Sequence, residues 1–538
     1  MAAPYRGGAG LADVSAESIA AVRTALMSGR RTGADPDFIA KATTQGWQVA
    51  TGAVGLLLEP RLINLFPVLS PIRNWMSRHS APNGATAVQW RAITGINVAG
   101  LKPGVADGLR NNVVTSAERD RQQAFKSFGY DDFVTFDAQD SAANIYDLRA
   151  EASANLLAAV MATGEEPLIL GGNVSALGPP AFVDANITDG AAAVVGPFIA
   201  AAYDIGISAL TQFGYANGAA GHVGTADALD ETKVQTVAAT HTLAGGRTSV
   251  TIVWPALRGA VAYNVYIAAT HSGTMYYAGT TTATKVTLVT AAGAATIAAA
   301  PVTYPASTVG TPLVVAALPS TTGVPNTADQ TADALAFDGL IPQVEVNANS
   351  TFVDATVQYN GGGYFKDLSG GVYTSDGGAG IVELDNMLKS LWDTSRIGPT
   401  RIYVNSQEAE TWGKLIVQAG TATGATGATR MVQQVNADGS VTGGLVADSY
   451  RNKFTSPRII PIEIHPYLAP GTVLALSERL PFPRANVPSA FQLEVLREYT
   501  QYDWAQVQRR WEFGIYAREC LKVYFPAGCG VLVGNTAS

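Results

Sequence analysis

The sequence contains very little cysteine. Its 538 residues include two cysteines, Cys520 and Cys529, both near the carboxyl-terminal end. The eight residues between them do not give the CxxC spacing of a zinc site. A secreted scaffold held by disulfides commonly has more cysteines. We therefore expect two free, buried thiols in a protein of a reducing compartment.

Long apolar runs are absent as well. The longest run, AAAVVGPFIAAAY at 191–203, is shorter than the ~20 residues that span a bilayer, and Asp189 and Asp204 lie close to its ends. The segment MAAPYRGGAGLADVSAES lacks the charged start and apolar core of a secretory signal. These features predict a chain that is made in the cytoplasm and has no membrane partner.

The known motifs of enzyme chemistry do not occur in the sequence. There is no GxSxG or HExxH motif, and GGGYFK lacks the spacing and the Ser/Thr of a phosphate-binding loop. Adjacent acids such as Asp131 and Asp132 are interpreted as solvated charges, because acid/base pairs normally converge from separate elements. We predict that the protein is not an enzyme and uses no cofactor and no metal. The five histidines share no metal-ligand spacing: His79, His222, His241, His271 and His465.

Charge is scarce and unevenly distributed. Charged residues make up 14% of the chain, compared with about 25% in typical domains. The net charge is −8, yet residues 61–130 contain nine Lys or Arg and three Asp or Glu. This basic segment is expected to dock on the acidic surface of a neighbouring copy, with a solvated basic loop as the alternative. No basic helix with interleaved aromatics is present, so sequence-specific binding of nucleic acid is not expected.

Residues 85–137 contain two strand-like runs around a tip rich in Gly, Pro and Asn, GLKPGVADGLRNN. This pattern predicts a long two-stranded hairpin. Because an isolated hairpin is only marginally stable in water, we expect it to lie on a neighbouring subunit. Lys102, in the tip, is either an ordinary exposed lysine or the amine of a covalent subunit crosslink. The expected inter-subunit contacts are Arg91, Lys102, Arg110, Arg119 and Arg121.

The clearest helical pattern is DSAANIYDLRAEASANLLAAVMAT at 140–163. Its apolar residues recur at i, i+3 and i+4 spacing, which places them along one stripe. Asp140 or Ser141 can cap its start, and Gly164 can end it. The following PLILGGN, at 167–173, is predicted to be extended.

Two further patterns are found toward the carboxyl-terminal end. The amphipathic segment 381–395 predicts a helix, 400–405 a strand, and Ser406 the cap of a second helix. The alternating residues in QVQRRWEFGIYARECLKVYF predict long strands of an antiparallel sheet.

The middle of the chain has the pattern of a small β-sandwich. The stretch SVTIVWPALRGAVAYNVYIA, at 249–268, alternates, turns at Pro and Gly, and alternates again. Four or more short β runs, with turns every 8 to 12 residues, are typical of a sandwich. We place this module at 229–307. Its expected core residues are Trp254, Tyr263, Val265 and Tyr266.

The order of these segments resembles the Hong Kong 97 fold of tailed-bacteriophage major capsid proteins, which encapsulins share. The resemblance depends on LLLEPRLINLFPVLSPIRNWMS, QWRAITGINVAGLKPG with FGYDDFVTFD, DLRAEASANLLAAVMATGEEPLILGGN, and IVELDNMLKSLWDTSRIGPTRIYVNSQEAETWGKLI with IEIHPYLAPGTVLALSERLPFP. It implies an α+β fold with an N-arm, extended loop, spine helix, peripheral domain and axial domain. The module at 229–307 is then an inserted all-β sandwich, similar to a fibronectin type III or immunoglobulin-like domain.

The resemblance divides the chain into seven parts. These are an N-terminal arm at 1–75, an extended loop at 76–137, the spine helix with the first part of the peripheral domain at 138–228, the inserted module at 229–307, a linker returning to the capsid core at 308–345, a mainly axial domain at 346–490, and terminal peripheral-domain strands at 491–538.

The resemblance also implies a function. The expected protein is a major capsid protein that assembles in the host cytoplasm, as pentamers and hexamers, into the icosahedral head of a tailed phage. The expected partners are further copies of the chain, scaffolding, portal and decoration proteins, and double-stranded DNA enclosed without sequence-specific binding. The alternatives are an encapsulin-like compartment, a cell-surface carbohydrate-binding protein, and a glycosidase with an accessory module.

Overall fold

The computed structural model combines helices and strands, which confirms the predicted α+β class. Of the predicted N-terminal arm at 1–75 it describes the last six residues, in which α4 spans Pro71–Trp75. The structure describes the following residues: 70–96, 103–105, 107–111, 113–142, 147–183, 187–189, 202–203, 205–216, 230–236, 241–242, 249–268, 275–290, 313–315, 324–345, 363–368, 371–376, 380–418, 434–435, 441–442, 448–455, 458–480, 487 and 489–535.

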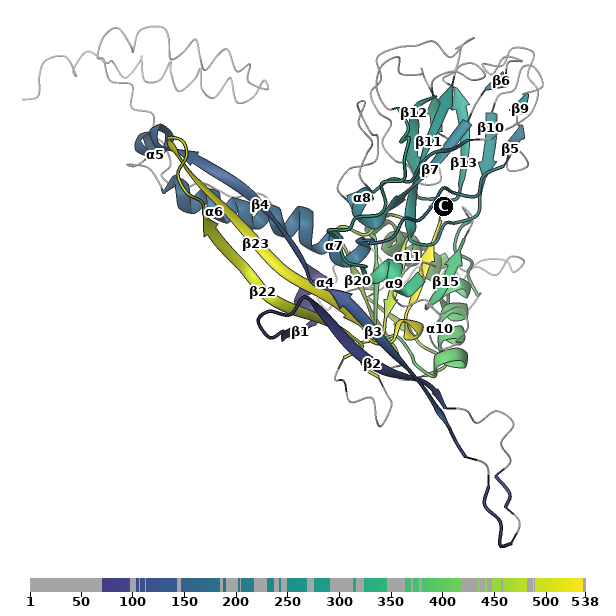
Figure 1. The fold of residues 1–538 in the computed structure, drawn as a ribbon. Coiled ribbons are helices and arrows are strands. Elements are labelled where there is room, and N and C mark those ends of the chain that lie inside the picture. The colour runs from purple at the N-terminus through teal and green to yellow at the C-terminus, as the bar shows by residue number, and fades with distance from the viewer. Residues whose placement is uncertain are drawn as a thin grey trace, which may run out of the picture. The chain divides into compact units, whose positions relative to one another are not determined.

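A four-stranded sheet with the order β1-β22-β23-β4 joins segments far apart in the sequence. The long antiparallel pair β22–β23 confirms the expected carboxyl-terminal sheet. Helix α6 (Leu148–Ala159) packs along β4 and β23 (Figure 1), and Leu156 lies in a small core with Val134 and Phe513. The strands are β1 (Ser77–Ser80), β22 (Phe491–Asp503), β23 (Arg510–Val523) and β4 (Lys126–Thr135).

The helix predicted at 140–163 differs from the observed one at both ends. Asp140 and Ser141 lie inside a separate helix, α5 (Phe136–Ala142), and α6 begins at Leu148. The cap of α6 is Asp147, whose Oδ1 accepts from the amides of Arg149 and Ala150 at 3.1 and 3.2 Å.

Gly164 does not end the helix either. Residues Val160–Glu165 form a π-helical turn, and α7 (Glu166–Gly171) continues from it. The prediction that PLILGGN is extended is therefore wrong for its first residues. Leu168, Ile169 and Leu170 are all buried in the largest core, so burial on every side selects a helix that local pattern alone does not indicate.

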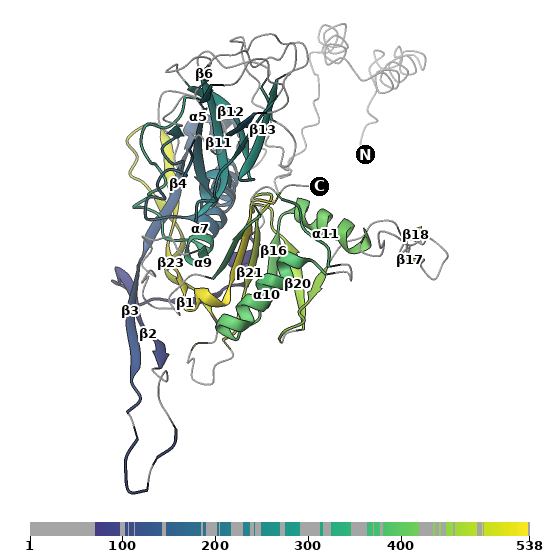
Figure 2. The ribbon, with the colours of Figure 1, turned by 90° about the vertical axis from the view of Figure 1, so that its right-hand side faces the viewer.

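The second sheet is six-stranded, in the order β15-β24-β21-β16-β20-β19. Helices α10 (Val382–Ser395) and α11 (Ser406–Gln418) lie beside β16, β20 and β21 in Figure 2. Helix α10 confirms the helix predicted at 381–395, α11 confirms the second predicted helix, and β16 confirms the strand predicted at 400–405. The strands are β15 (Tyr364–Asp367), β24 (Gly530–Val533), β21 (Val473–Leu476), β16 (Arg401–Val404), β20 (Ile459–Ile464) and β19 (Ser449–Arg451).

Two more four-stranded sheets, β14-β13-β10-β5 and β12-β11-β7-β8, form a sandwich, because their facing side chains belong to one buried core. Trp254, Tyr263 and Val265 lie in this core, and Tyr266 is fully buried in the same unit. The strands are β5 (Ile187–Asp189), β7 (Ile205–Thr211), β8 (Gln235–Thr236), β10 (Ser249–Val253), β11 (Ala260–Ala268), β12 (Met275–Thr281), β13 (Lys285–Thr290) and β14 (Leu313–Val315).

The sheets of the sandwich extend beyond the module range predicted at 229–307. Strand β5 pairs with β10 and β7 pairs with β11, although both β5 and β7 precede residue 229. Strand β14, from the predicted linker at 308–345, pairs with β13. The sandwich is therefore built from the 229–307 segment together with strands on either side of it in the sequence.

Strands β2 (Ala87–Ile96) and β3 (Ser116–Ala124) form an antiparallel pair, which confirms the predicted hairpin. The second predicted run is split, since β3 ends before Phe125 and the next strand, β4, pairs with β23. The remaining elements are β6 (Ala202–Tyr203) with β9 (His241–Thr242), β17 (Gln434–Val435) with β18 (Val441–Thr442), α8 (Gln212–Ala216), α9 (Leu340–Glu345) and a 3-10 turn at Pro526–Gly528.

Both cysteines are free and buried, as the sequence predicts. Burial raises the pKa of each thiol to about 12, so neither is a reactive thiolate at neutral pH. Within the described ranges, no helix is long and apolar enough to cross a membrane.

Candidate assembly surface

The β2–β3 hairpin has little support from the rest of the described structure. Its two strands pair with each other and, among the described residues, with no other strand. In both views of the ribbon it runs away from the β1-β22-β23-β4 sheet (Figures 1 and 2). Two isolated strands bury too little surface to be stable alone in water.

The base of the hairpin is fixed to the sheet by an aromatic and cationic contact. The Trp90 ring on β2 lies 6.0 Å from the Tyr524 ring, edge to face. Lys522 on β23 places its ammonium 5.7 Å from the centre of the Trp90 ring and 2.7 Å from Glu494 Oε1. These contacts hold the root of the hairpin against the sheet.

The distal part exposes large apolar side chains. Leu109 is 69% exposed and Val113 is 83% exposed. Burying a Leu or Val side chain contributes about 1.5–3 kcal/mol, so a surface that covers them gains stability. Sequence reasoning singled out the basic residues and missed these apolar ones, although VV within a polar tip was a visible signal. The exposed set is Ile93, Val105, Leu109, Val113 and Val114.

The structure describes the predicted contact residues unequally. Arg91 is exposed and forms a 3.8 Å ion pair with Glu118 of the opposite strand, and Arg110 is exposed near the tip. Arg119 and Arg121 occupy β3 opposite Ala92 and Trp90 in the backbone register. Lys102 lies outside the described residues. The hairpin thus brings these arginines onto one element, and their contact with a neighbour remains a prediction.

A second group of exposed aromatic side chains lies at the far end of the β22–β23 pair. Trp504 and Tyr516 both donate to Asp131 Oδ1, at 3.0 and 2.9 Å. Burial and the neighbouring Asp131 carboxylate raise the pKa of Tyr516, so it stays a donor at neutral pH. Phe133 and Val507 are exposed nearby on β4 and the β22–β23 turn. This end of the sheet is a second candidate contact surface.

A buried ion pair fixes α4 to the same sheet. Arg73 Nη1 lies 2.7 Å from Glu519 Oε1 and 2.8 Å from Oε2, and both side chains are buried. A buried charge without its partner is costly, so this pair specifies where the segment before β1 docks.

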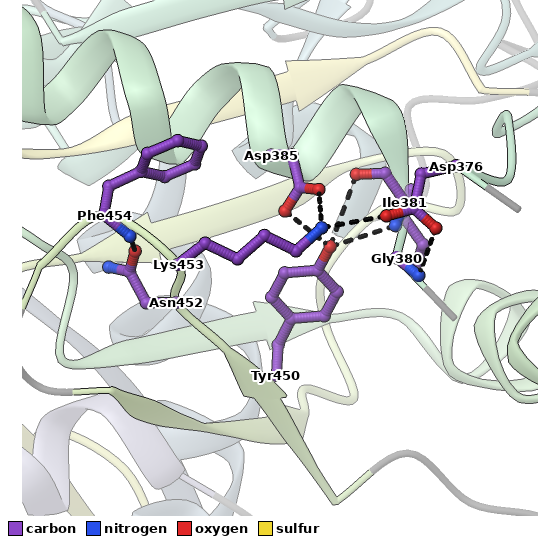
Figure 3. Close-up of polar contacts among 8 residues, drawn as sticks. All are labelled: Asp376, Gly380, Ile381, Asp385, Tyr450, Asn452, Lys453 and Phe454. Atoms are coloured by element: carbon purple, nitrogen blue, oxygen red, sulfur yellow. Dashed lines mark hydrogen bonds and ion pairs between the residues drawn. The ribbon is translucent and has the colours of Figure 1, made fainter. Parts of the chain in front are cut away.

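A network of charges holds the start of α10 against β19 (Figure 3). Lys453 Nζ lies 2.8 Å from Asp376 Oδ2 and 2.6 Å from Asp385 Oδ2, and these hydrogen bonds raise its pKa. Tyr450 donates to Asp385 Oδ1 at 2.8 Å and accepts from the Ile381 amide at 2.9 Å. The charged groups of Lys453, Asp376 and Asp385 and the hydroxyl of Tyr450 all have protein partners, so we assign this network a structural role.

In the described parts of the chain, no group of His, Cys, Asp or Glu has the arrangement of a metal site. His465, interpreted from the sequence as structural, is fully buried between the rings of Tyr403 and Tyr467.

Comparisons with known proteins find structures but no sequence relatives. No family model matches the chain, and no curated protein matches it. The chain is similar to the capsid of a native GTA particle, with 8% identity, a TM-score of 0.40, and coverage of 91% of this chain and 100% of the other. It is similar to the capsid of cyanophage A-1(L), with 8% identity, a TM-score of 0.44, and coverage of 90% of this chain and 98% of the other. It is also similar to the capsid of Myoviridae phage XM1, with 8% identity, a TM-score of 0.34, and coverage of 90% of this chain and 99% of the other.

Proposed function

We propose that this chain is the major capsid protein of a tailed bacteriophage and assembles into a closed shell. The observation that carries the proposal is the β2–β3 hairpin, which pairs with no other described strand and exposes apolar side chains. The order of hairpin, long helix, second sheet with its two helices, and long antiparallel pair also follows the order that the resemblance to the Hong Kong 97 fold implies.

The hairpin and the charge distribution supply the assembly mechanism. Ile93, Leu109 and Val113 are buried when the hairpin lies across the next copy. Arg91 and Arg110 lie on the same hairpin, and the chain outside the basic 61–130 segment has an excess of acids. Opposite charges therefore orient the contact, while each exposed pair contributes only about 0–1 kcal/mol.

A heterologous contact of this kind closes into rings when its rotation permits. We infer pentamers and hexamers that tile an icosahedral head, built in the host cytoplasm with scaffolding, portal and decoration proteins. The shell encloses double-stranded DNA without reading its sequence. A net charge of −8 limits adhesion of the wall to the phosphate backbone.

The test replaces one exposed leucine of the hairpin by aspartate. Leu109→Asp is expected to lower the fraction of chain in large assemblies at least tenfold, because a buried carboxylate opposes docking. The matched control is Leu335→Asp, since Leu335 is 77% exposed and lies outside the hairpin. Sedimentation velocity of the full chain measures both. Equal assembly of the two variants would contradict the proposal.

We further propose that the sandwich is an immunoglobulin-like knob on the outer face of the shell. Its own core, shared by the facing side chains of its two sheets, supports this. An epitope inserted between Ala268 and Met275 is expected to bind antibody on intact particles. An epitope that becomes accessible only after particles are disrupted would place the knob inside.

A further inference from the structure

A cavity of about 370 Å³ opens at the base of the hairpin, beside the β1-β22-β23-β4 sheet. The loop 83–86, directly before β2, forms one side of it, and β22, β23 and β4 form the rest. Its volume is large enough for a small ligand or a protein side chain. Two arginines line it, Arg497 of β22 and Arg518 of β23.

These two arginines are opposed in the sheet. Arg497 and Arg518 are direct partners in the antiparallel register of β22 and β23. Like charges placed opposite each other on neighbouring strands are destabilising. The register shifts on both sides of Arg497, and such bulges redirect side chains next to binding sites. The chain therefore holds two cations together at the wall of a cavity.

Within the described structure, no carboxylate pairs with either arginine. Arg497 Nη1 donates to the Tyr502 hydroxyl, and its guanidinium lies 5.7 Å from the centre of the Tyr502 ring. The Nε of Arg518 is buried and has no hydrogen-bond partner. A buried donor without an acceptor costs about 1–3 kcal/mol, so the site gains stability from a ligand that accepts.

The acids nearest in sequence and register already have other partners. Glu519 pairs with Arg73, and Glu494 with Lys522 and His79. Glu498 lies 3.9 Å from Arg78. These acids are thus already paired with other cations, which leaves Arg497 and Arg518 for a group from outside.

We propose that Arg497 and Arg518 bind a carboxylate, supplied by an Asp or Glu side chain of a second copy of this chain. Guanidinium groups match the planar carboxylate and donate to it bidentately. A second copy is a suitable source because the chain has 43 acidic and 35 basic residues, with the acid excess outside the 61–130 segment. That the pocket binds a carboxylate does not depend on the proposed function. That the carboxylate comes from a second copy rests on the proposed assembly.

The binding test uses the unassembled full chain labelled with [15N]arginine. N-acetylglutamate amide, which presents a single Glu side chain, is titrated at constant ionic strength, with inorganic phosphate in a parallel series. We expect the Nε–Hε signals that disappear in Arg497→Gln and Arg518→Gln to shift saturably with the glutamate probe. Arg451→Gln is the control, since Arg451 is exposed on β19, which belongs to the six-stranded sheet.

The assembly test uses the same three variants in sedimentation velocity. Arg497→Gln and Arg518→Gln are expected to raise the concentration needed for assembly at least tenfold, and Arg451→Gln to change it less than twofold. Removing one of two opposed cations should leave the thermal midpoint of the unassembled chain unchanged or higher. If one variant fails to fold, the other variant still assigns its own Nε–Hε signal, and the titration of that signal in the wild-type chain decides.

The outcomes separate the two claims. A saturable shift with the glutamate probe and loss of assembly support the proposal. A shift with phosphate alone overturns the carboxylate assignment, and no shift with normal assembly of both variants overturns the pocket. If the wild-type chain never assembles, the proposed function fails, and a saturable shift then supports the pocket while overturning a second copy as its occupant.

Discussion

At the scale of residues, buried carboxylates define where separate segments meet. Glu519 accepts hydrogen bonds from Arg73. Glu345 lies at the end of α9 and accepts a hydrogen bond from the Gly259 amide at the base of the sandwich. These groups are expensive to bury and are compensated by named partners. Sequence patterns assign such acids to solvent, because the partner comes from a segment hundreds of residues away.

Arg73→Met is expected to destabilise the chain by about 3–5 kcal/mol, because it leaves Glu519 buried without its cation. The double variant Arg73→Met with Glu519→Leu should recover most of this loss, since both charges are then replaced by apolar groups. Urea unfolding of the unassembled chain measures both. A double variant as unstable as the single one would show that the pair does not act as a unit.

The stability of the chain should also depend on pH through Glu345. Burial raises its pKa from 4.5 to about 8, opposed by the Gly259 amide and the Arg258 charge. The folded state therefore binds a proton that the unfolded state releases, and stability falls as pH rises from about 4.5 to about 8. The contribution of the group approaches about 1.4 kcal/mol per pH unit.

The matched variant is Glu345→Gln, which keeps an acceptor for the Gly259 amide and removes the titration. We expect a smaller decline in stability between pH 5 and pH 8 than in the wild type, measured by urea unfolding at fixed ionic strength. The same decline in both chains would show that Glu345 is not the group responsible.

At the scale of elements, helix α11 gives a direct comparison of two candidate caps. The sequence pattern favours Ser406, but the helix begins at Ser406, and Asn405 Oδ1 accepts from the Gln407 amide at 3.1 Å. Asn405→Ala should therefore cost about 1 kcal/mol of stability, and Ser406→Ala only a few tenths. Urea unfolding measures the stability of both variants. A larger loss of stability in Ser406→Ala than in Asn405→Ala would show that Ser406 is the cap, as the sequence pattern indicates.

Elements with a strong local pattern could be predicted from the sequence. The amphipathic α10, the strand β16, and the β2–β3 and β22–β23 pairs are found where alternation or helical spacing indicated them. Helix α7 could not be predicted, because its apolar residues are buried on all sides and give no periodicity. The limits of the sandwich could not be predicted either, since β5 and β7 join it by strand pairings that local sequence does not encode.

The candidate assembly surface was predictable only in part. The hairpin and its arginines follow from turn residues and charge counts, whereas the exposed Leu109 and Val113 were missed, although the VV pair beside a polar tip was a signal. The opposed Arg497 and Arg518 depend on a register of strands that contains two irregularities. No sequence rule places such a pair, because a one-residue shift changes the face of every side chain.

At the scale of the whole molecule, the proposed assembly would let a second copy complete three features of the single chain. The hairpin needs a surface, the aromatic end of β22–β23 needs a cover, and the arginine pocket needs a carboxylate. Each of these contacts contributes little free energy by itself. Because every copy in a closed lattice makes the same contacts, their contributions add up over the shell. A shell thus accounts for these features together better than a dispersed monomer does.

The most direct measurement is negative-stain electron microscopy of the full chain purified after expression, alone and with added scaffolding protein. The account predicts closed shells, or rings with five and six subunits, and their loss in Leu109→Asp. A chain that stays monomeric under both conditions, at concentrations where phage heads form, would contradict it.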